Sequence, residues 1–163
     1  MTSSSVQADP REASAADLVL NMTRKFAAPR DLVFEMWTKQ EHLVNWWGPQ
    51  GMTIPECEMD VRVGGKWRTV MRSGEGNLFI VSGVYKEITP STKLVFTWGW
   101  ETDGVRGNES TVTLEFVETS DGTIINLHQA DLADKDDRDA HGKGWDSSLS
   151  CLEEDVAARQ AGK

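Results

Sequence analysis

The sequence predicts an α+β fold, in which a curved antiparallel sheet of about seven strands lies over one long C-terminal helix. From about residue 53 to residue 132 apolar and polar residues alternate, which is the period of strands with one buried face. The segment 141–159 instead repeats its apolar residues at the period of a helix. It is the only long amphipathic helix that the pattern predicts, and its apolar stripe needs the sheet as a partner.

The N-terminal segment 1–16 differs in composition from the rest of the chain. It is rich in Ser and Ala and nearly free of large apolar residues, so it cannot bury enough surface to offset the entropy of ordering. We therefore predict a flexible tail over residues 1–16. Residues 17–160 are predicted to form a single domain, since their number is ordinary for one domain.

A first strand and two short helices are predicted before the alternating region. Alternation over residues 18–26 indicates the strand, and Pro29 is a typical first residue of a helix. Thr38 with Glu41 three residues later has the spacing of a capping box for the second helix. Gly48-Pro49 is expected to end it.

The strands that follow are joined by short turns rich in Gly, Asp and Asn, which predicts an antiparallel meander. Pro55 lies where the apolar residues change parity, as expected of a bulge or an edge strand. Three acidic residues near it share one parity and are predicted to face solvent rather than to act as catalytic carboxylates: Glu56, Glu58 and Asp60.

The long helix carries a stripe of large apolar residues at spacings of four, three and four: Trp145, Leu149, Leu152 and Val156. Two glycines weaken its beginning, by about 1 kcal/mol each relative to Ala. Either Gly142 and Gly144 mark a ragged first turn, or they admit a close neighbour such as Trp46 or Trp47.

Acidic residues crowd the predicted start of the long helix, where they favour its dipole. Asp134 with Asp137 could cap the helix, and Asp139 is the rival cap. The run also resembles part of a calcium loop, but Ser148 stands where such a loop needs a bidentate Glu, so no calcium site is expected.

The composition excludes several classes of function. A formal charge of −9 argues against a nucleic-acid partner and against an anionic membrane surface. No segment has the length of a transmembrane helix or the pattern of a signal peptide, so a cytoplasmic location is the default expectation. Cys57 and Cys151 lie far apart and are predicted to be buried thiols rather than a disulfide.

The three histidines show no spacing typical of metal ligands, so no metal site is predicted. His42 and His141 are interpreted as surface residues. His128 lies on the last predicted strand with the parity opposite to Leu127. It is either an ordinary polar residue or part of a pocket wall.

Several segments together resemble the homologues of the activator of heat-shock-protein-90 ATPase, a family within the START-like (SRPBCC) superfamily. The resemblance covers about residues 17–160. It rests on Trp46-Trp47-Gly48-Pro49, Gly64-Gly65-Lys66-Trp67-Arg68, Gly83-Val84-Tyr85-Lys86-Glu87-Ile88-Thr89-Pro90, Leu94-Val95-Phe96-Thr97-Trp98, and Gly144-Trp145 followed by Leu149 and Leu152.

This resemblance implies a helix-grip fold with an apolar cavity between sheet and helix. It implies no shared catalytic residue. We expect no additional N-terminal domain of the kind found in the co-chaperone that gave the family its name, so a chaperone partner is the less favoured alternative.

Seven Trp against one Tyr suggest walls built from wide, flat side chains, either of a closed core or of a cavity. We expect binding of a hydrophobic or aromatic small molecule without a cofactor. The alternatives are a cyclase, dehydratase or hydrolase that uses the same cavity, and a protein-interaction module. The candidate ligand-binding residues are Trp46, Trp67, Met71, Phe96, Trp98, His128, Trp145 and Leu149.

Overall fold

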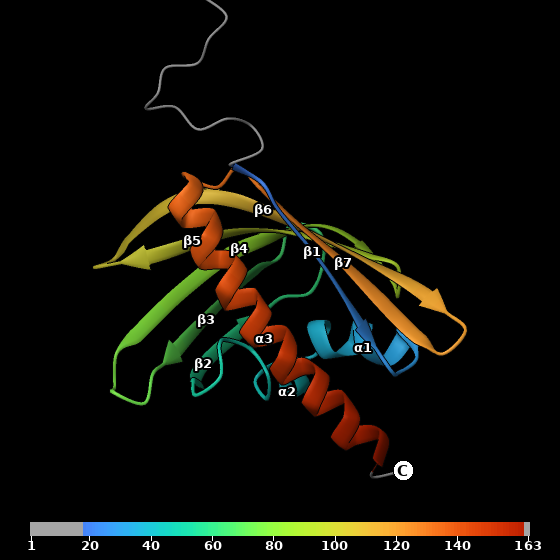
Figure 1. Ribbon diagram of the computed structural model, residues 1–163. Helices are drawn as coiled ribbons and strands as arrows, with labels where there is room; N and C mark the ends of the chain where they lie inside the picture. The colour runs from blue at the N-terminus through green and yellow to red at the C-terminus, as the bar shows by residue number, and fades with distance from the viewer. Residues whose placement is uncertain (1–17, 162–163) are drawn as a thin grey trace, which may run out of the picture.

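The computed structural model describes residues 18–161, and the predicted tail over residues 1–16 lies outside them. In this part of the chain, one seven-stranded antiparallel sheet curves over a long helix, with two short helices beneath it (Figure 1). The predicted α+β fold is confirmed. The elements are β1 (Leu20–Phe26), α1 (Arg30–Thr38), α2 (Gln40–Leu43), β2 (Thr53–Met59), β3 (Lys66–Arg72), β4 (Leu78–Thr89), β5 (Lys93–Thr102), β6 (Val105–Thr119), β7 (Gly122–Ala130) and α3 (Lys135–Ala161).

The strands follow the order β1-β7-β6-β5-β4-β3-β2, so β2 to β7 form the predicted meander and β1 joins its last strand. Since β1 and β2 are opposite edges, α1 and α2 carry the chain from one edge to the other. The register of β2 against β3 shifts between Thr53 and Glu56, which flank Pro55. Pro55 therefore lies both on an edge strand and at a bulge, as predicted.

Helix α3 begins at Lys135, about 1.7 turns before residue 141, where the apolar pattern indicates its start. The Asp137 amide donates to Asp134 Oδ1 at 2.8 Å, and the Ala133 amide donates to Asp137 Oδ2 at 3.0 Å. The predicted cap by Asp134 and Asp137 is confirmed, whereas Asp139 instead pairs with Arg138. The first turns are polar, and a search for apolar periodicity does not detect them.

The predicted capping box of the second short helix is wrong. Thr38 is the last residue of α1, and its hydroxyl donates to the Phe34 carbonyl at 3.1 Å. Lys39 takes the N-cap position of α2, and its side chain makes no capping hydrogen bond. The two helices follow each other too closely for Thr38 to leave α1 and cap α2.

The core lies between the concave face of the sheet and α3, and indoles fill much of it. All four residues of the predicted stripe on α3 are buried: Trp145, Leu149, Leu152 and Val156. Trp47 is central, with ring centroids 5.6–6.2 Å from those of five other indoles: Trp37, Trp46, Trp67, Trp98 and Trp145. Such edge and tilted contacts add to the stabilisation from burial.

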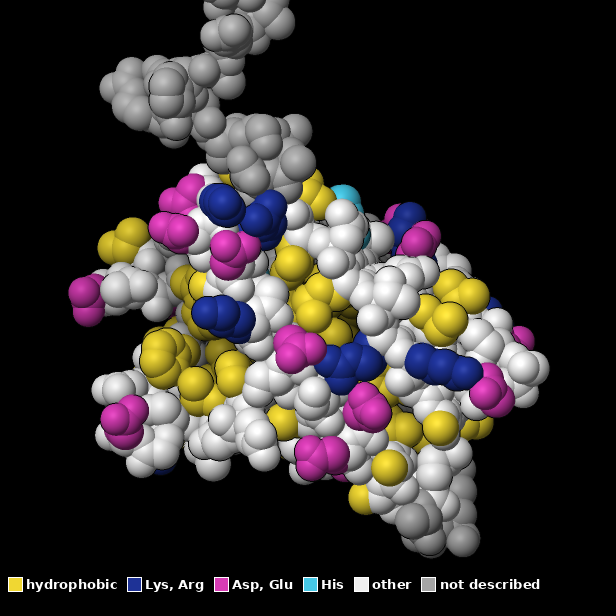
Figure 2. Space-filling view, viewed as in Figure 1, with side chains coloured by type: hydrophobic (Ala, Val, Ile, Leu, Met, Phe, Trp, Pro, Cys, Tyr) yellow, Lys and Arg dark blue, Asp and Glu magenta, His cyan; other side chains and the backbone are white. Residues whose placement is uncertain are grey.

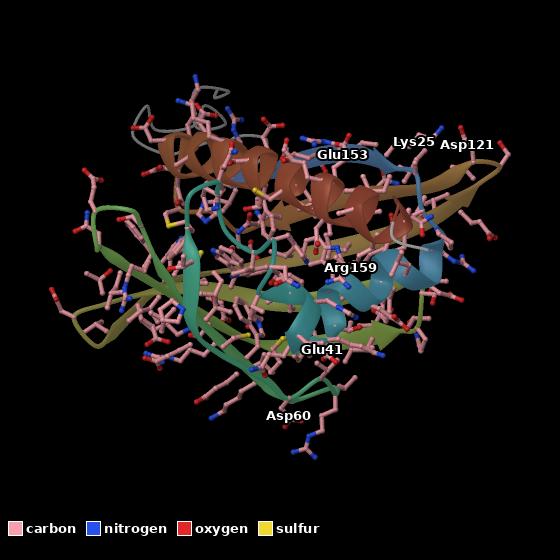
Figure 3. All side chains as sticks on the ribbon, turned by 90° about the horizontal axis from the view of Figure 1, so that it is seen from below. Lys25, Glu41, Asp60, Asp121, Glu153 and Arg159 are labelled. Atoms are coloured by element: carbon pink, nitrogen blue, oxygen red, sulfur yellow. The ribbon has the colours of Figure 1, made fainter. Side chains whose placement is uncertain are left out.

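Ion pairs connect α3 with the edge strand β1. Arg24 of β1 donates to Asp146 Oδ1 at 2.7 Å and to Glu153 Oε1 at 3.1 Å, and Figure 3 shows Glu153 on the side of α3 that faces β1. At the end of β1, Lys25 lies 2.7 Å from Asp121 in the β6–β7 turn (Figure 3). Acidic residues of α3 thus pair with Arg24 of the edge strand.

Leu152→Ala should lower the free energy of unfolding by about 2–5 kcal/mol, because the side chain is fully buried and its removal leaves a cavity. Equilibrium denaturation in urea measures the change. Glu154→Ala, two residues on and exposed, is the control and should change it by less than about 0.5 kcal/mol. A cost below about 1 kcal/mol for Leu152→Ala would contradict the packing of α3 on the sheet.

Candidate ligand cavity

A cavity of about 340 Å³ opens between the first half of α3, the loop that precedes β2, and strands β3 to β5. Its volume lies within the range of small-molecule sites. Figure 2 shows hydrophobic side chains around a hollow beside α3 on this face. The lining residues are Trp47, Gly48, Pro49, Met52, Met71, Phe79, Trp98, Trp100, Asp137, Ala140, His141, Gly144, Trp145 and Ser148.

Helix α3 supplies one wall of the cavity as a single helical stripe. Its lining residues recur at spacings of three and four: Asp137, Ala140, His141, Gly144, Trp145 and Ser148. At a rise of 1.5 Å per residue, Asp137 and Ser148 lie about 16 Å apart along the axis. The part of α3 that lines the cavity is therefore about three helical turns long.

Gly144 occupies the middle of this wall. A Cβ atom at Gly144 would meet no atom within 4 Å, whereas one at Gly142 would lie 3.4 Å from Leu20 Cδ1. Both glycines lie well inside α3, so they do not mark a ragged first turn. Neither admits Trp46 or Trp47 at close range, and the close neighbour of Gly142 is Leu20 instead. The missing side chain of Gly144 instead leaves space in the cavity.

The indoles that line the cavity direct their N–H groups into the protein. Trp47 Nε1 donates to Thr69 Oγ1 at 2.9 Å, and Trp145 Nε1 donates to Gln129 Oε1 at 2.8 Å. Trp98 and Trp100 both donate to His141 Nε2, each at 3.1 Å. With these donors engaged, the indoles offer the cavity mainly carbon surface.

His141 is 8% exposed, so its interpretation as a surface residue is wrong. Nε2 accepts two indole N–H groups and therefore carries no proton. Nδ1 carries it and donates to the Asp137 carbonyl at 2.9 Å, with Asp137 Oδ1 at 3.2 Å. The imidazole is thus held as one neutral tautomer, and in this arrangement Nε2 is not free to take a proton from a ligand.

Two polar side chains on the wall retain hydrogen-bonding capacity. The Asp137 carboxylate accepts from the Ala133 amide and contacts His141 Nδ1, which leaves part of its accepting capacity unused. Ser148 is buried, and its hydroxyl has no hydrogen-bond partner within residues 18–161. A few polar groups in an apolar pocket are what orient a ligand.

Three of the predicted binding residues, Met71, Trp98 and Trp145, line this cavity. Trp67 and Phe96 instead line a separate hollow of about 20 Å³, which is room for one water molecule. Trp47 lines both spaces, so its ring lies between them.

The other three predicted binding residues line neither space. Trp46 and Leu149 are buried core residues, and Trp46 Nε1 donates to the Met36 carbonyl at 3.0 Å. His128 is exposed and lies 2.8 Å from Asn21 Oδ1 on the neighbouring strand. Its neighbours Leu127 and Gln129 are buried, so the alternation of β7 turns His128 away from the cavity.

Some lining residues that were not among the predicted binding residues are nevertheless indicated by patterns in the sequence. Trp100 has the parity of Trp98, and steps of four back from Trp145 reach His141 and Asp137. Continuing the helical period toward the N-terminus could have identified these two. Phe79 and Met52 had no such signal, because the sheet and the loop before β2 bring them to the cavity only in the folded chain.

Burial keeps two weakly acidic groups protonated, the Cys57 thiol and the Tyr85 hydroxyl, of which Tyr85 lines the smaller hollow. The pKa of the Cys57 thiol rises to about 11, first through burial and then through the charge of Glu58. Burial, followed by the charges of Cys57 and Asp60, also raises the pKa of the Tyr85 hydroxyl. Both groups are neutral at pH 7, so neither supplies an anion. Cys57 and Cys151 are free thiols as predicted, but both are half-buried rather than buried.

Within residues 18–161, no three His, Cys, Asp or Glu side chains gather in a way that could hold a metal ion. No helix in the same part of the chain is long and apolar enough to cross a membrane.

A sheet wrapped around a C-terminal helix, with an indole-walled cavity between them, defines a protein of the START-like helix-grip class. The chain belongs to the family described as "Activator of Hsp90 ATPase homolog 1-like protein", whose sequence profile matches residues 27–157. The resemblance noted from the sequence is thereby confirmed.

Solved structures of similar proteins share this fold. A protein of this family from Silicibacter pomeroyi is 33% identical, with a TM-score of 0.80 over 86% of this chain and 99% of its own. A protein from Nitrosomonas europaea is 30% identical, with a TM-score of 0.76 over 90% and 98% of the two chains. A protein from Arthrobacter aurescens has a TM-score of 0.77 over 90% of each chain at 17% identity, a likeness of fold alone. A search of curated proteins found no match.

The bonds between His141 and the two indoles can be tested by a double-mutant cycle at pH 8, where free imidazole is neutral. His141→Leu should leave the buried Trp98 N–H without an acceptor, at a cost of about 1–3 kcal/mol. Trp98→Phe should then cost about 1 kcal/mol less in the His141→Leu background than in wild type, as measured by urea denaturation.

The control for this cycle is Trp46→Phe, because Trp46 donates to Met36 and not to His141. Its effect should simply add to that of His141→Leu. If the effects of Trp98→Phe and His141→Leu also simply add, the hydrogen bond from Trp98 to His141 is contradicted.

Proposed function

We propose that the protein binds a hydrophobic or aromatic small molecule in the cavity between the sheet and α3, without an obligatory cofactor. The observation that carries the proposal is a cavity of about 340 Å³ whose walls are mostly indole, sulfur and aliphatic surface. Membership of the START-like superfamily, whose members commonly bind ligands, supports it by analogy of fold.

The energetics of the cavity suit a ligand with an aromatic body. Burying roughly 200–300 Å² of apolar ligand surface contributes about 5–8 kcal/mol before the cost of association is subtracted. The walls are held in place by hydrogen bonds: Trp47, Trp98 and Trp145 each have a protein acceptor for the indole N–H. Such preorganisation lowers the part of the binding energy that would be lost to ordering side chains.

Gly144 allows the cavity to be filled without damage to the core. Gly144→Leu places a side chain in open space and replaces a poor helix former, so stability should stay equal or rise by up to about 1 kcal/mol. Binding of the neutral fluorescent probe N-phenyl-1-naphthylamine should fall at least about tenfold, because the side chain takes the volume that the ligand needs. Probe titration and urea denaturation measure the two effects.

The matched control is Gly142→Ala, which gives a similar gain in helix propensity but lies against Leu20 outside the cavity. It should leave the affinity for the probe unchanged. If Gly144→Leu binds the probe as wild type does, binding occurs elsewhere. If wild type does not bind the probe, the proposal loses its main support. Native mass spectrometry of freshly purified protein would show whether a small molecule co-purifies.

A further inference from the structure

We propose that this cavity selects ligands with a positively charged ammonium group on an elongated apolar or aromatic body, in preference to neutral or anionic ligands of the same shape. The inference rests on the proposed function, because it names the chemical class that the same cavity would take. The inference goes beyond the proposed function because it assigns the sign of the ligand's charge and the position of its charged group.

The charges on the wall of the cavity have one sign. Within residues 18–161, Asp137 is the one acidic side chain that lines the cavity, and both ring nitrogens of His141 are occupied by hydrogen bonds within the protein. In the part of the chain that the structure describes, no Lys or Arg is among the lining residues. The neighbouring Arg138 pairs with Asp139 and does not line the cavity. An anion would therefore enter a site with a carboxylate and no lining cation, which is unfavourable.

Asp137 can accept from a ligand without losing its present bonds. A carboxylate offers about four accepting positions, and the contacts with Ala133 and His141 use two of them. The positive end of the α3 dipole opposes a cation here. The acidic side chains of the first turn, Asp136 and Asp137, offset that dipole.

The carboxylate lies toward the open end of the cavity. Its side chain is 28% exposed, and Phe79 on the opposite wall is 41% exposed. Trp145 and Ser148, further along α3, are each only 4% exposed and mark the closed end. An ammonium beside Asp137 would keep part of its hydration while the apolar body lies inside, which limits the cost of desolvating the charge.

Two indoles complete the surroundings of the proposed ammonium position. Trp98 and Trp100 donate to the imidazole that also contacts Asp137, so all three side chains cluster around His141. The N–H edge is the positive edge of an indole, and here both edges point to His141 rather than to a ligand. The rest of each indole lines the cavity, and a cation placed over its electron-rich face would be attracted, most strongly by Trp among the aromatic residues.

The test compares three naphthalene ligands of matched shape by isothermal titration calorimetry at pH 7. These are 2-(2-naphthyl)ethylamine, which is protonated, the neutral 2-(2-naphthyl)ethanol, and the anion 2-naphthylacetate. The amine should bind about tenfold more tightly than the alcohol, and the acetate should bind most weakly. Asp137→Asn should bring the affinity for the amine to within about threefold of that for the alcohol, and the ratio of these two affinities is the quantity compared between variants.

Asp136→Asn is the matched control, because it removes the same charge from the same turn but does not line the cavity. It should keep the preference for the amine. Asp137→Glu retains the charge and should keep most of the preference even if the helix cap is weakened. Thermal melts followed by circular dichroism show whether each variant is folded.

The outcomes separate this inference from the proposed function. Equal binding of all three ligands would overturn the charge preference and leave the proposed function standing. An equal loss of preference in Asp136→Asn and Asp137→Asn would also overturn it, because the net charge of the chain would then be the cause. If wild type binds none of the ligands and does not bind the neutral naphthylamine probe, both proposals fail.

Discussion

The packing of α3 on the concave face of the sheet is the interaction on which the rest of the structure depends. One strip of α3 buries Leu149, Leu152 and Val156 completely, and Trp145 meets the indoles of Trp37, Trp47 and Trp98 at its edge. Without the sheet, the apolar face of α3 would be exposed to water, and without α3 the concave face of the sheet would be exposed. The cavity exists because the two layers meet closely along only part of their length.

Side-chain size along α3 decides where the two layers meet closely and where they leave space. Leu and Val fill the second half of the interface, whereas Gly144 and Ala140 leave the first half open. An interior normally closes such a gap, because unfilled space costs dispersion contacts. Here the gap persists because the indoles around it are fixed by hydrogen bonds to Thr69, Gln129 and His141 and cannot collapse into it.

His141 combines structural and electrostatic roles in this arrangement. It accepts two indole N–H groups with one nitrogen and donates toward Asp137 with the other, which satisfies three polar groups in a mostly apolar region. The same bonds occupy both imidazole nitrogens, so that among the described residues Asp137 is the one acidic side chain on the wall. A structural network therefore sets the chemistry that the cavity offers to a ligand.

The sequence by itself determined the class of fold, the sheet of about seven strands and the apolar stripe of the last helix. Alternation and helical periodicity report which face of an element is buried, and burial of those faces leaves few arrangements. The Asp134–Asp137 cap was also predictable, because it depends on neighbours in the chain.

Only the tertiary structure decided the site. Two predicted wall residues, Trp46 and Leu149, belong to the core, because periodicity identifies a buried face but not whether core or cavity lies against it. His128 is exposed, on the face of β7 opposite to buried Leu127 and Gln129. The cavity is the volume left over between α3, the loop before β2 and three strands, and its extent depends on distances among residues far apart in the chain. The role of Gly144 shows this most clearly: the residue itself is visible in the sequence, but the empty space beside it is set by the placement of the surrounding indoles.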